Sequence, residues 1–309
     1  MIVPVFHSAE ILPELARRLL PVLEAEARRF ELLLIDDDSR DRSWEVIREL
    51  AARHGWVRGY RLTRNYGQHN ALLSGIQRAT GEIVVTLDDD LQHPPEEIPR
   101  LLAALGPDCD VVYGTPEREQ HGLWRDLASR VTKFALRSAM GAEIAEQVSA
   151  FRAFRLPLRE AFADYASPYV SIDVLLTWAT TRFAAVRVRH EPRHSGVSHY
   201  TFSRLLAHAL NMLTGFSIRP LQLASLIGFV FTLFGSLVLA YVLGRYWLQG
   251  TSVPGFPFLA SVIAIFSGAQ LFALGIIGEY LARMHFRTMG RPPFAVREST
   301  ERRGAPEAR

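Results

Sequence analysis

The chain has 309 residues, a formal charge of +3 and 49% hydrophobic residues, enough for one full domain and a smaller module. Its single cysteine excludes an intrachain disulfide and is compatible with a reducing, cytosolic compartment. It has no Lys/Arg-rich block and no nucleic-acid-binding motif, so we expect no DNA or RNA partner.

Strand-like and helix-like segments alternate over the first 200 residues. Apolar runs predict strands at residues 2–6, 30–35, 57–62, 83–87 and 110–113. Between them and after them, amphipathic runs predict helices at 14–23, 41–52, 70–79 (closed by Gly81), 95–105 and 123–139. Repeated β-α units predict an α/β domain with a mostly parallel, Rossmann-like sheet and helices on both faces. Ligands of such sheets bind beyond the carboxyl ends of the strands. No G-x-G-x-x-G follows the first strand, which argues against a hydride-transfer enzyme.

The character of the chain changes after residue 201. Residues 202–216 have the spacing of a helix lying in a membrane interface. Residues 221–243 and 256–277 carry no charge and are each long enough to cross a bilayer core of about 30 Å. The alternative is a helical hairpin buried in a soluble protein. We expect residues 280–289 to return along the membrane surface and the chain to be flexible from about residue 298.

Arginines flank the predicted hairpin unevenly. The short linker has only Arg245, whereas several arginines lie before and after the spans, namely Arg204, Arg219, Arg283, Arg287 and Arg291. The positive-inside rule then places both ends of the chain on the cytoplasmic side of the membrane. The predicted organisation is an α/β domain (1–200), an interface helix (201–219), a transmembrane hairpin (220–279) and a cytoplasmic segment with a tail (280–309).

Two acidic triplets follow two of the predicted strands. In residues 86–95, strand alternation would put Asp88, Asp90 and Gln92 on one side and Asp89 on the other. Converging carboxylates suit Mg²⁺ or Mn²⁺, which shares its coordination shell with substrate phosphates. The alternative is a solvated acidic turn before a helix that begins with proline.

The other triplet, residues 36–38, could accept a hydrogen bond from a uracil or guanine N–H. The alternative is that these acids cap the next helix, for which Ser39 and Asp41 are also candidates. An α/β domain with a metal site and a membrane anchor suggests a phosphate-rich donor and a lipid-bound acceptor.

Four motifs, at residues 33–37, 63–69, 86–100 and 196–200, occur in the order of a known family. Together they resemble glycosyltransferase family 2 with the GT-A fold, in its polyprenyl-phosphate glycosyltransferase branch. That branch includes dolichyl-phosphate mannose synthases and bactoprenol glucosyltransferases. Residues 65–69 and 90–100 look closest to undecaprenyl-phosphate 4-deoxy-4-formamido-L-arabinose transferases. The resemblance covers roughly residues 2–295.

The resemblance implies an inverting, metal-dependent glycosyltransferase. Its donor would be a nucleotide sugar, UDP-linked by resemblance, and its acceptor a polyprenyl phosphate such as undecaprenyl phosphate. The product would be a lipid-linked sugar for envelope or lipopolysaccharide modification, with glucose, mannose, a hexosamine and an amino-arabinose derivative all open. It also implies a multi-pass location in the bacterial inner membrane and allows a homo-oligomer. A catalytically impaired membrane scaffold that binds sugar nucleotides is the alternative.

The resemblance also assigns site residues. The nucleotide would be bound by Pro4, Val5, Asp37 and Asp88. The metal and the chemistry would depend on Asp88, Asp90 and Gln92. The donor sugar or its phosphates would approach Arg64, Asn65, Gln68 and His69. The acceptor phosphate would meet Arg118, Arg125, Ser129, Arg193, Ser198 and His199.

The chain departs from the family pattern at three places. Ala150 stands where some relatives have an aspartate, so either no general base is needed or another acid such as Glu146 substitutes. His7 replaces a common asparagine. Asp38 replaces a usual glycine, and aspartate tolerates a positive φ better than most residues.

Overall fold

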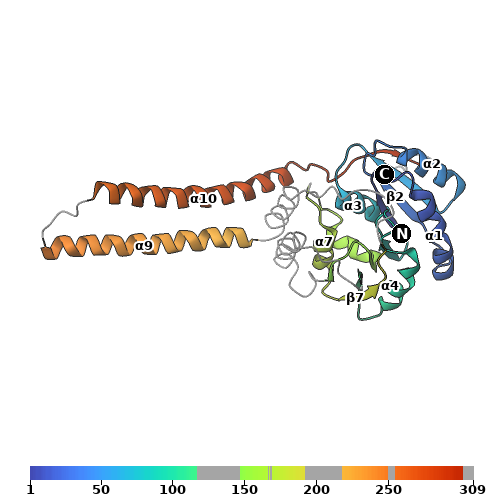
Figure 1. Cartoon of the computed structure of the whole chain (residues 1–309), viewed down its shortest axis with the longest axis horizontal. Coiled ribbons are helices and arrows are strands. Elements are labelled where there is room, and N and C mark those ends of the chain that lie inside the picture. The colour runs from blue at the N-terminus through green and yellow to red at the C-terminus, as the bar shows by residue number, and fades with distance from the viewer. Residues whose placement is uncertain (117–146, 166, 168, 192–217, 250–254, 302–309) are drawn as a thin grey trace.

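A computed structural model of the chain describes residues 1–116, 147–165, 167, 169–191, 218–249 and 255–301. It has an α/β domain from which two long helices extend (Figure 1). After the second of these helices the chain returns to the domain. The predicted helix at 123–139 and the predicted interface helix at 202–216 lie outside the described residues.

The described strands form one sheet in the order β7-β5-β6-β4-β1-β2-β3-β8. Their bounds are β1 Ile2–Val5, β2 Leu32–Asp36, β3 Val57–Leu62, β4 Ile83–Thr86, β5 Val111–Pro116, β6 Arg152–Arg155, β7 Phe183–Val188 and β8 Val296–Ser299. The central strands β4, β1, β2 and β3 are parallel, whereas β6 and β8 run antiparallel to their neighbours. The predicted α/β fold with a mostly parallel sheet is confirmed.

Helices cover both faces of this sheet, as predicted. They are α1 Leu12–Glu26, α2 Ser43–Arg53, α3 Gln68–Arg78, α4 Ile98–Ala104 after a 3-10 turn at Pro95–Glu97, a second 3-10 segment at Leu156–Phe162, and α7 Ile172–Ala179. Successive strand residues point to opposite faces. Leu32 and Leu34 of β2 accordingly pack in one core with α1, α2 and α4, while Leu33 and Ile35 pack in the other with α3 and α7.

The residues predicted to end α3 and to cap α2 differ from those in the structure. Helix α3 ends at Arg78 because Ala79 is already extended (φ −61°, ψ 140°), so Gly81 does not close it. At the start of α2, Asp41 Oδ1 accepts the N–H of Ser43 at 3.1 Å, whereas the Ser39 hydroxyl accepts the N–H of His7. The residue before α2 is Arg42, so neither Ser39 nor Asp41 is the predicted N-cap, although Asp41 supports the first turn.

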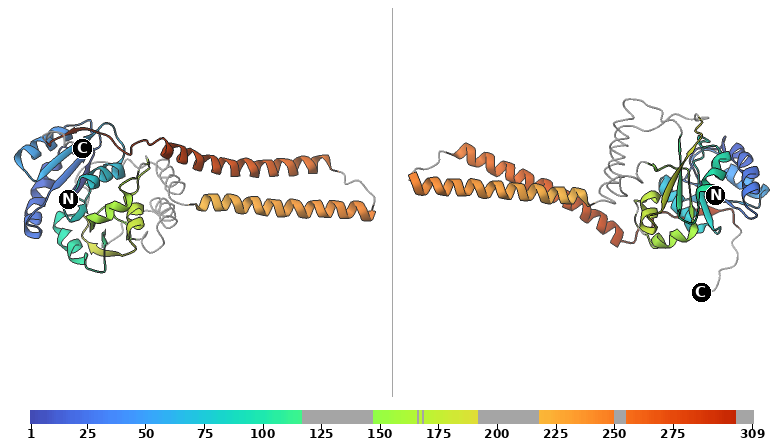
Figure 2. Two further views of the ribbon diagram at one scale, coloured as in Figure 1. Left: turned by 180° about the vertical axis from the view of Figure 1, so that it is seen from behind. Right: turned by 90° about the horizontal axis from the view of Figure 1, so that it is seen from below.

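The two C-terminal helices are α9 (Arg219–Gln249) and α10 (Phe256–Thr288), which lie side by side (Figure 2). By length and composition, Arg219–Leu248 and Ile265–Thr288 could each cross a membrane. The predicted return of residues 280–289 along the surface is wrong, because α10 continues unbroken to Thr288. No glycine or proline interrupts that stretch, and Arg283 pairs with Glu279 one turn earlier at 2.7 Å.

The predicted flexible tail is also wrong for its first part. Glu298 lies in β8, which pairs antiparallel with β3 so that Arg61 faces Glu298 and Tyr60 faces Ser299. The polar composition of this segment gives no local sign of a strand. The pairing instead satisfies backbone groups at the open edge of β3, which lies far away in the sequence.

Candidate active site

The predicted nucleotide and metal residues meet at the carboxyl ends of β1, β2 and β4, which are neighbours in the sheet. A pocket of about 230 Å³ lies there. Its lining residues are Pro4, Val5, Phe6, Asp37, Asn65, Gly67, Gln68, Asp88, Asp89 and Asp90. The structure thus brings together Pro4, Val5, Asp37, Asp88 and Asp90, as the sequence predicted.

Larger hollows exist elsewhere, including one of about 680 Å³ beside Met1, Ile83 and Val84 at the amino ends of β1 and β4. We assign the site to the smaller pocket. It gathers four carboxylates at the strand ends where ligands of such sheets bind.

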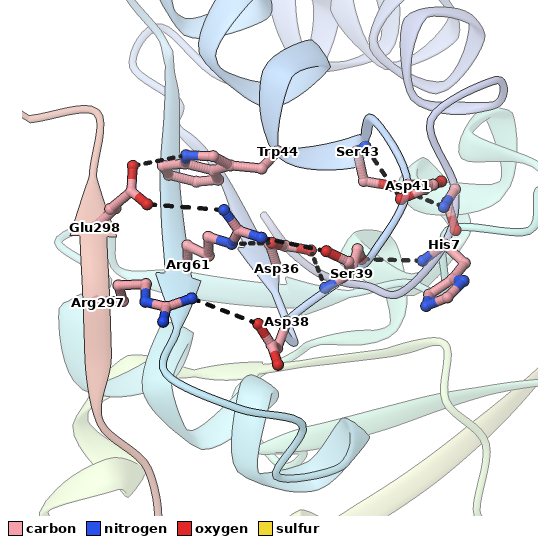
Figure 3. Close-up of polar contacts among 11 residues, drawn as sticks. His7, Asp36, Asp38, Ser39, Asp41, Ser43, Trp44, Arg61, Arg297 and Glu298 are labelled. Carbon is pink, nitrogen blue, oxygen red and sulfur yellow. Dashed lines mark hydrogen bonds and ion pairs between the residues drawn. The ribbon is translucent and has the colours of Figure 1, made fainter.

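Asp36 is a structural acid. Its side chain is fully buried, with Oδ1 accepting the N–H of Ser39 at 3.1 Å and Oδ2 lying 3.3 Å from Nε of Arg61 (Figure 3). Burial raises the pKa of Asp36, while the hydrogen bonds from Ser39 and the charge of Arg61 oppose that rise. The carboxylate therefore fixes the turn after β2.

Asp37 lines the pocket and also holds the loop after β3. Its carboxylate accepts the N–H groups of Tyr66 and Gly67, each at 2.7 Å. Burial raises the pKa of Asp37 above its usual value, although these two hydrogen bonds act in the opposite direction. Each carboxylate oxygen has a second lone pair that can accept a bond from a ligand. Contact between Asp37 and a base stays a prediction.

The backbone at two departures from the family pattern is unusual. Asp38 has φ 60° and His7 has φ 59°. The glycine usual at the position of Asp38 would adopt a positive φ readily, and aspartate is among the residues that tolerate it. His7 donates its N–H to the Ser39 hydroxyl at 3.0 Å, so the loop after β1 is tied to the turn after β2.

The second triplet lies in a turn rather than in a strand. β4 ends at Thr86, and Leu91 adopts φ 57°. The predicted alternation is therefore wrong, since Asp89 lines the same pocket as Asp88 and Asp90.

Gln92 is not among the described residues that line the pocket. Its N–H donates to Asp90 Oδ1 at 3.1 Å, and its carbonyl accepts the N–H of Glu191 at 2.8 Å. The predicted metal and catalytic role of Gln92 has no support from this geometry.

The acids of the second triplet contact neutral polar groups. Asp88 Oδ1 accepts the side-chain amide of Gln68 at 2.6 Å. Asp89 accepts the N–H of Phe6 at 3.2 Å and a short hydrogen bond from the Ser8 hydroxyl. Burial raises the pKa of Asp89, and these bonds partly offset the rise. Asp89 thus holds the loop after β1 against the pocket.

Asp88 and Asp90 supply the hard oxygen donors that Mg²⁺ or Mn²⁺ prefers. Within the described residues, no group of three or more His, Cys, Asp or Glu could hold a metal by itself. Two carboxylates in one pocket fit an ion whose remaining ligands come from water and from a bound diphosphate.

The predicted donor-sugar residues separate into two pairs. Asn65 and Gln68 line the pocket. Arg64 instead places its guanidinium 4.5 Å from the ring centre of Tyr66, and His69 Nδ1 accepts the N–H of Ile172 at 3.3 Å. Neither Arg64 nor His69 is among the described lining residues.

The predicted acceptor-phosphate residues lie outside the described part of the chain. They are Arg118, Arg125, Ser129, Arg193, Ser198 and His199. Glu146 lies outside it as well. Ala150 is described, and its carbonyl accepts the Thr86 hydroxyl at 2.8 Å.

Three lining residues were not predicted, and one of them is Asp89, which strand alternation placed on the other side. Phe6 directly follows β1 and is 50% exposed at the pocket. The sequence did contain a sign of this position, because Phe6 continues a strand whose carboxyl end faces the site. Gly67 has φ 94°, a conformation that favours glycine, and it donates its N–H to Asp37.

Comparisons with known proteins agree with this geometry. A family model described as Glycosyl transferase family 2 matches residues 1–162. The chain is 36% identical over 316 residues to an undecaprenyl-phosphate 4-deoxy-4-formamido-L-arabinose transferase of Pseudomonas paraeruginosa, covering 100% of this chain and 91% of the relative. It is 34% identical to the protein of that name from Pectobacterium carotovorum, covering 97% of this chain and 92% of the relative.

Among solved structures, the fold is similar to glucosyl-3-phosphoglycerate synthase of Mycobacterium tuberculosis in complex with Mn²⁺, uridine diphosphate and phosphoglyceric acid. The TM-score is 0.52 at 18% identity, covering 69% of this chain and 75% of that chain. This likeness concerns the fold alone. The matched family model and the full-length relatives together show that the chain belongs to glycosyl transferase family 2.

Proposed function

We propose that this glycosyltransferase moves a sugar from a nucleotide-sugar donor to a polyprenyl phosphate, with inversion at the anomeric carbon. The observation that carries the proposal is the pocket in which Asp37, Asp88 and Asp90 meet at the strand ends. Its polar wall suits a nucleoside diphosphate together with a divalent ion. The names of the full-length relatives support undecaprenyl phosphate as the acceptor.

In the proposed reaction, an oxygen of the acceptor phosphate attacks the anomeric carbon and the nucleoside diphosphate leaves. A phosphate monoester, with a second pKa of about 6, is already ionised at neutral pH. A strong general base is therefore not required, which agrees with Ala150 at the position where some relatives have an aspartate. Mg²⁺ or Mn²⁺ held by Asp88 and Asp90 would neutralise charge on the leaving diphosphate.

The remaining contacts at the pocket position the donor. Asp37 holds the N–H groups of Tyr66 and Gly67, which keeps the loop that contains Asn65 in place. Asp89 holds the loop that contains Phe6. A rigid pocket lowers the entropy lost when the donor binds.

The apolar helices bring this chemistry to a lipid acceptor. α9 and α10 have 31 and 33 residues, and at about 1.5 Å per residue each exceeds a bilayer core of about 30 Å. We propose that they form a hairpin in the bacterial cytoplasmic membrane, with the α/β domain of residues 1–200 and both termini in the cytoplasm. Arg219 before the hairpin and Arg283 and Arg287 at its end favour this orientation.

The decisive experiment is reconstitution. The full-length protein is incubated in lipid nanodiscs with undecaprenyl phosphate, Mg²⁺ or Mn²⁺ and a panel of UDP- and GDP-linked sugars, and the lipid product is identified by mass. We expect a glycosyl-phosphoryl-undecaprenol with one donor, lost on addition of EDTA. Donor binding without product for any sugar would favour the scaffold alternative, and product formation in EDTA would contradict the metal's role.

A further inference from the structure

The strand β8 links the end of α10 to the candidate donor pocket. The chain leaves α10 at Thr288 and returns to the edge of the sheet (Figure 1). There Ala295 O accepts the N–H of Thr63 at 2.9 Å. Thr300 bonds Gly59 twice, through its N–H at 3.0 Å and its hydroxyl at 2.8 Å. β8 is thus fastened along β3, and it reaches the first residue of the loop that lines the pocket.

A chain of polar contacts runs from β8 toward the first acidic triplet (Figure 3). Trp44 Nε1 donates to Glu298 Oε2 at 3.0 Å, and Glu298 Oε1 lies 3.7 Å from Arg61 Nη1. Arg61 in turn lies 3.3 Å from Asp36 and donates to the Ser39 carbonyl, also at 3.3 Å. Glu298 therefore fixes the arginine that holds both ends of the turn after β2.

A second, weaker contact reaches the same turn. Arg297 Nη1 lies 3.9 Å from Asp38 Oδ1, and these side chains are 54% and 34% exposed. An exposed pair at this distance contributes little by itself. The position of this pair matters more than its strength, because it lies on one side of Asp37 in the chain. On the other side, Arg61 of β3 contacts Asp36, and Glu298 of β8 contacts Arg61.

We propose that β8 is a positioning element of the donor pocket, in which Glu298 acts through Arg61 to fix the turn that presents Asp37. The proposal rests on the proposed function, since it assigns the pocket to a nucleotide sugar. β8 and α10 are joined by only a few residues, so this contact also couples the apolar hairpin to the donor site. Glu298 is not among the residues proposed for the acceptor phosphate.

The test compares Glu298 with Glu301, an acid two residues beyond the end of β8. Glu301 pairs with Arg58 at 3.4 Å, near the amino end of β3 and away from the pocket. Glu298→Gln keeps an oxygen that can accept the Trp44 N–H but removes the charge facing Arg61. Glu298→Lys puts a second cation beside Arg61. Glu301→Gln and Glu301→Lys are the matched controls.

We expect the donor KM to rise about threefold in Glu298→Gln, as one partly exposed ion pair would give, and about tenfold in Glu298→Lys. The acceptor KM and kcat should stay within about twofold of the wild type, and both Glu301 variants should match the wild type. Thermal unfolding checks that each full-length variant is folded. Unchanged donor KM in Glu298→Lys would overturn the proposal, as would equal changes in donor KM, acceptor KM and kcat.

Calorimetry of nucleotide-sugar binding in the absence of acceptor tests the role of β8 separately from the proposed function. Weaker donor binding in the Glu298 variants alone supports the role of β8. A wild-type protein that binds no nucleotide sugar would overturn the proposed function. Wild-type and Glu298 variants that bind it equally would overturn only the role of β8.

Discussion

The two Asp-Asp-Asp triplets are identical in sequence and follow strands that flank β1, yet their surroundings differ. In the first, Asp36 and Asp38 pair with Arg61 and Arg297. In the second, Asp88 accepts the amide of Gln68, Asp89 accepts the hydroxyl of Ser8 and the N–H of Phe6, and Asp90 accepts the N–H of Gln92. Position at a strand end therefore does not decide what an acid does.

The first triplet mainly holds the turn after β2, whereas the second lies wholly in the lining of the pocket. Within the first, only Asp37 lines the pocket, and its carboxylate already accepts two backbone N–H groups. All three acids of the second line it. We therefore expect substitutions in the second triplet to affect chemistry most, and substitutions in the first to affect donor binding and stability.

The largest effect is expected from Asp90→Asn. The asparagine oxygen can still accept the Gln92 N–H, so the fold should be kept while the charge of the proposed metal ligand is lost. We expect kcat to fall by at least about 100-fold, the order reported for loss of a strong electrostatic contact to the transition state. The measurement is lipid product formed per minute at saturating donor, with thermal unfolding as the check of folding.

The matched control is Asp38→Asn in the other triplet. Its contact with Arg297 is long and exposed, so kcat should change less than about twofold. If the two variants lost activity equally, the division of roles between the triplets would be wrong. Undiminished turnover in Asp90→Asn would contradict the metal role of that residue.

A smaller effect is expected from Asp37→Asn, which tests whether the first triplet serves the donor. One carboxylate oxygen becomes an NH₂ group facing a backbone N–H, so a buried hydrogen bond is replaced by a clash of donors. A lost buried hydrogen bond costs about 1–3 kcal/mol. We expect a lower unfolding temperature and a donor KM raised about tenfold, with kcat reduced less. A fall in kcat alone would place Asp37 in the chemical step.

Much of this arrangement could be read from the sequence, because it depends on local patterns. The apolar runs of β2 and β4, and the acids at the ends of these strands, predicted where Asp37, Asp88 and Asp90 gather. The turn after β4 could not be read, since Leu91 at φ 57° is a conformation that leucine rarely adopts. Without that turn, strand alternation would have sent Asp89 away from the pocket.

Contacts between segments that lie far apart in the chain could not be predicted from the sequence either. Nothing near Glu298 indicates a strand, because β8 forms only by completing the edge of β3. For Gln92, the acidic motif suggested a ligand, and the structure shows its backbone bonded to Asp90 and Glu191, so its role as a ligand stays a prediction.

The smallest effect concerns His93, a buried histidine three residues after Asp90. It is 9% exposed, and its ring lies 4.9 Å from that of His190 and 5.4 Å from that of Phe151. Burial, with a smaller contribution from the nearby His190, lowers the pKa of His93 from 6.5 to about 4, although Asp90 acts in the opposite direction. The folded protein therefore keeps this histidine neutral where the unfolded chain would protonate it.

The sign of the pH dependence follows from that difference. Above pH 6.5 both states are neutral at His93, so the folded state loses nothing. As the pH falls from 6.5 toward 4, the unfolded chain takes up a proton that the folded protein does not, and the folded state loses about 2 kcal/mol by pH 5. In His93→Gln this loss is absent. The fall in unfolding temperature between pH 7 and pH 5 should then be about 5 °C smaller than in the wild type. Equal falls in the two proteins would show that His93 is protonated in the fold.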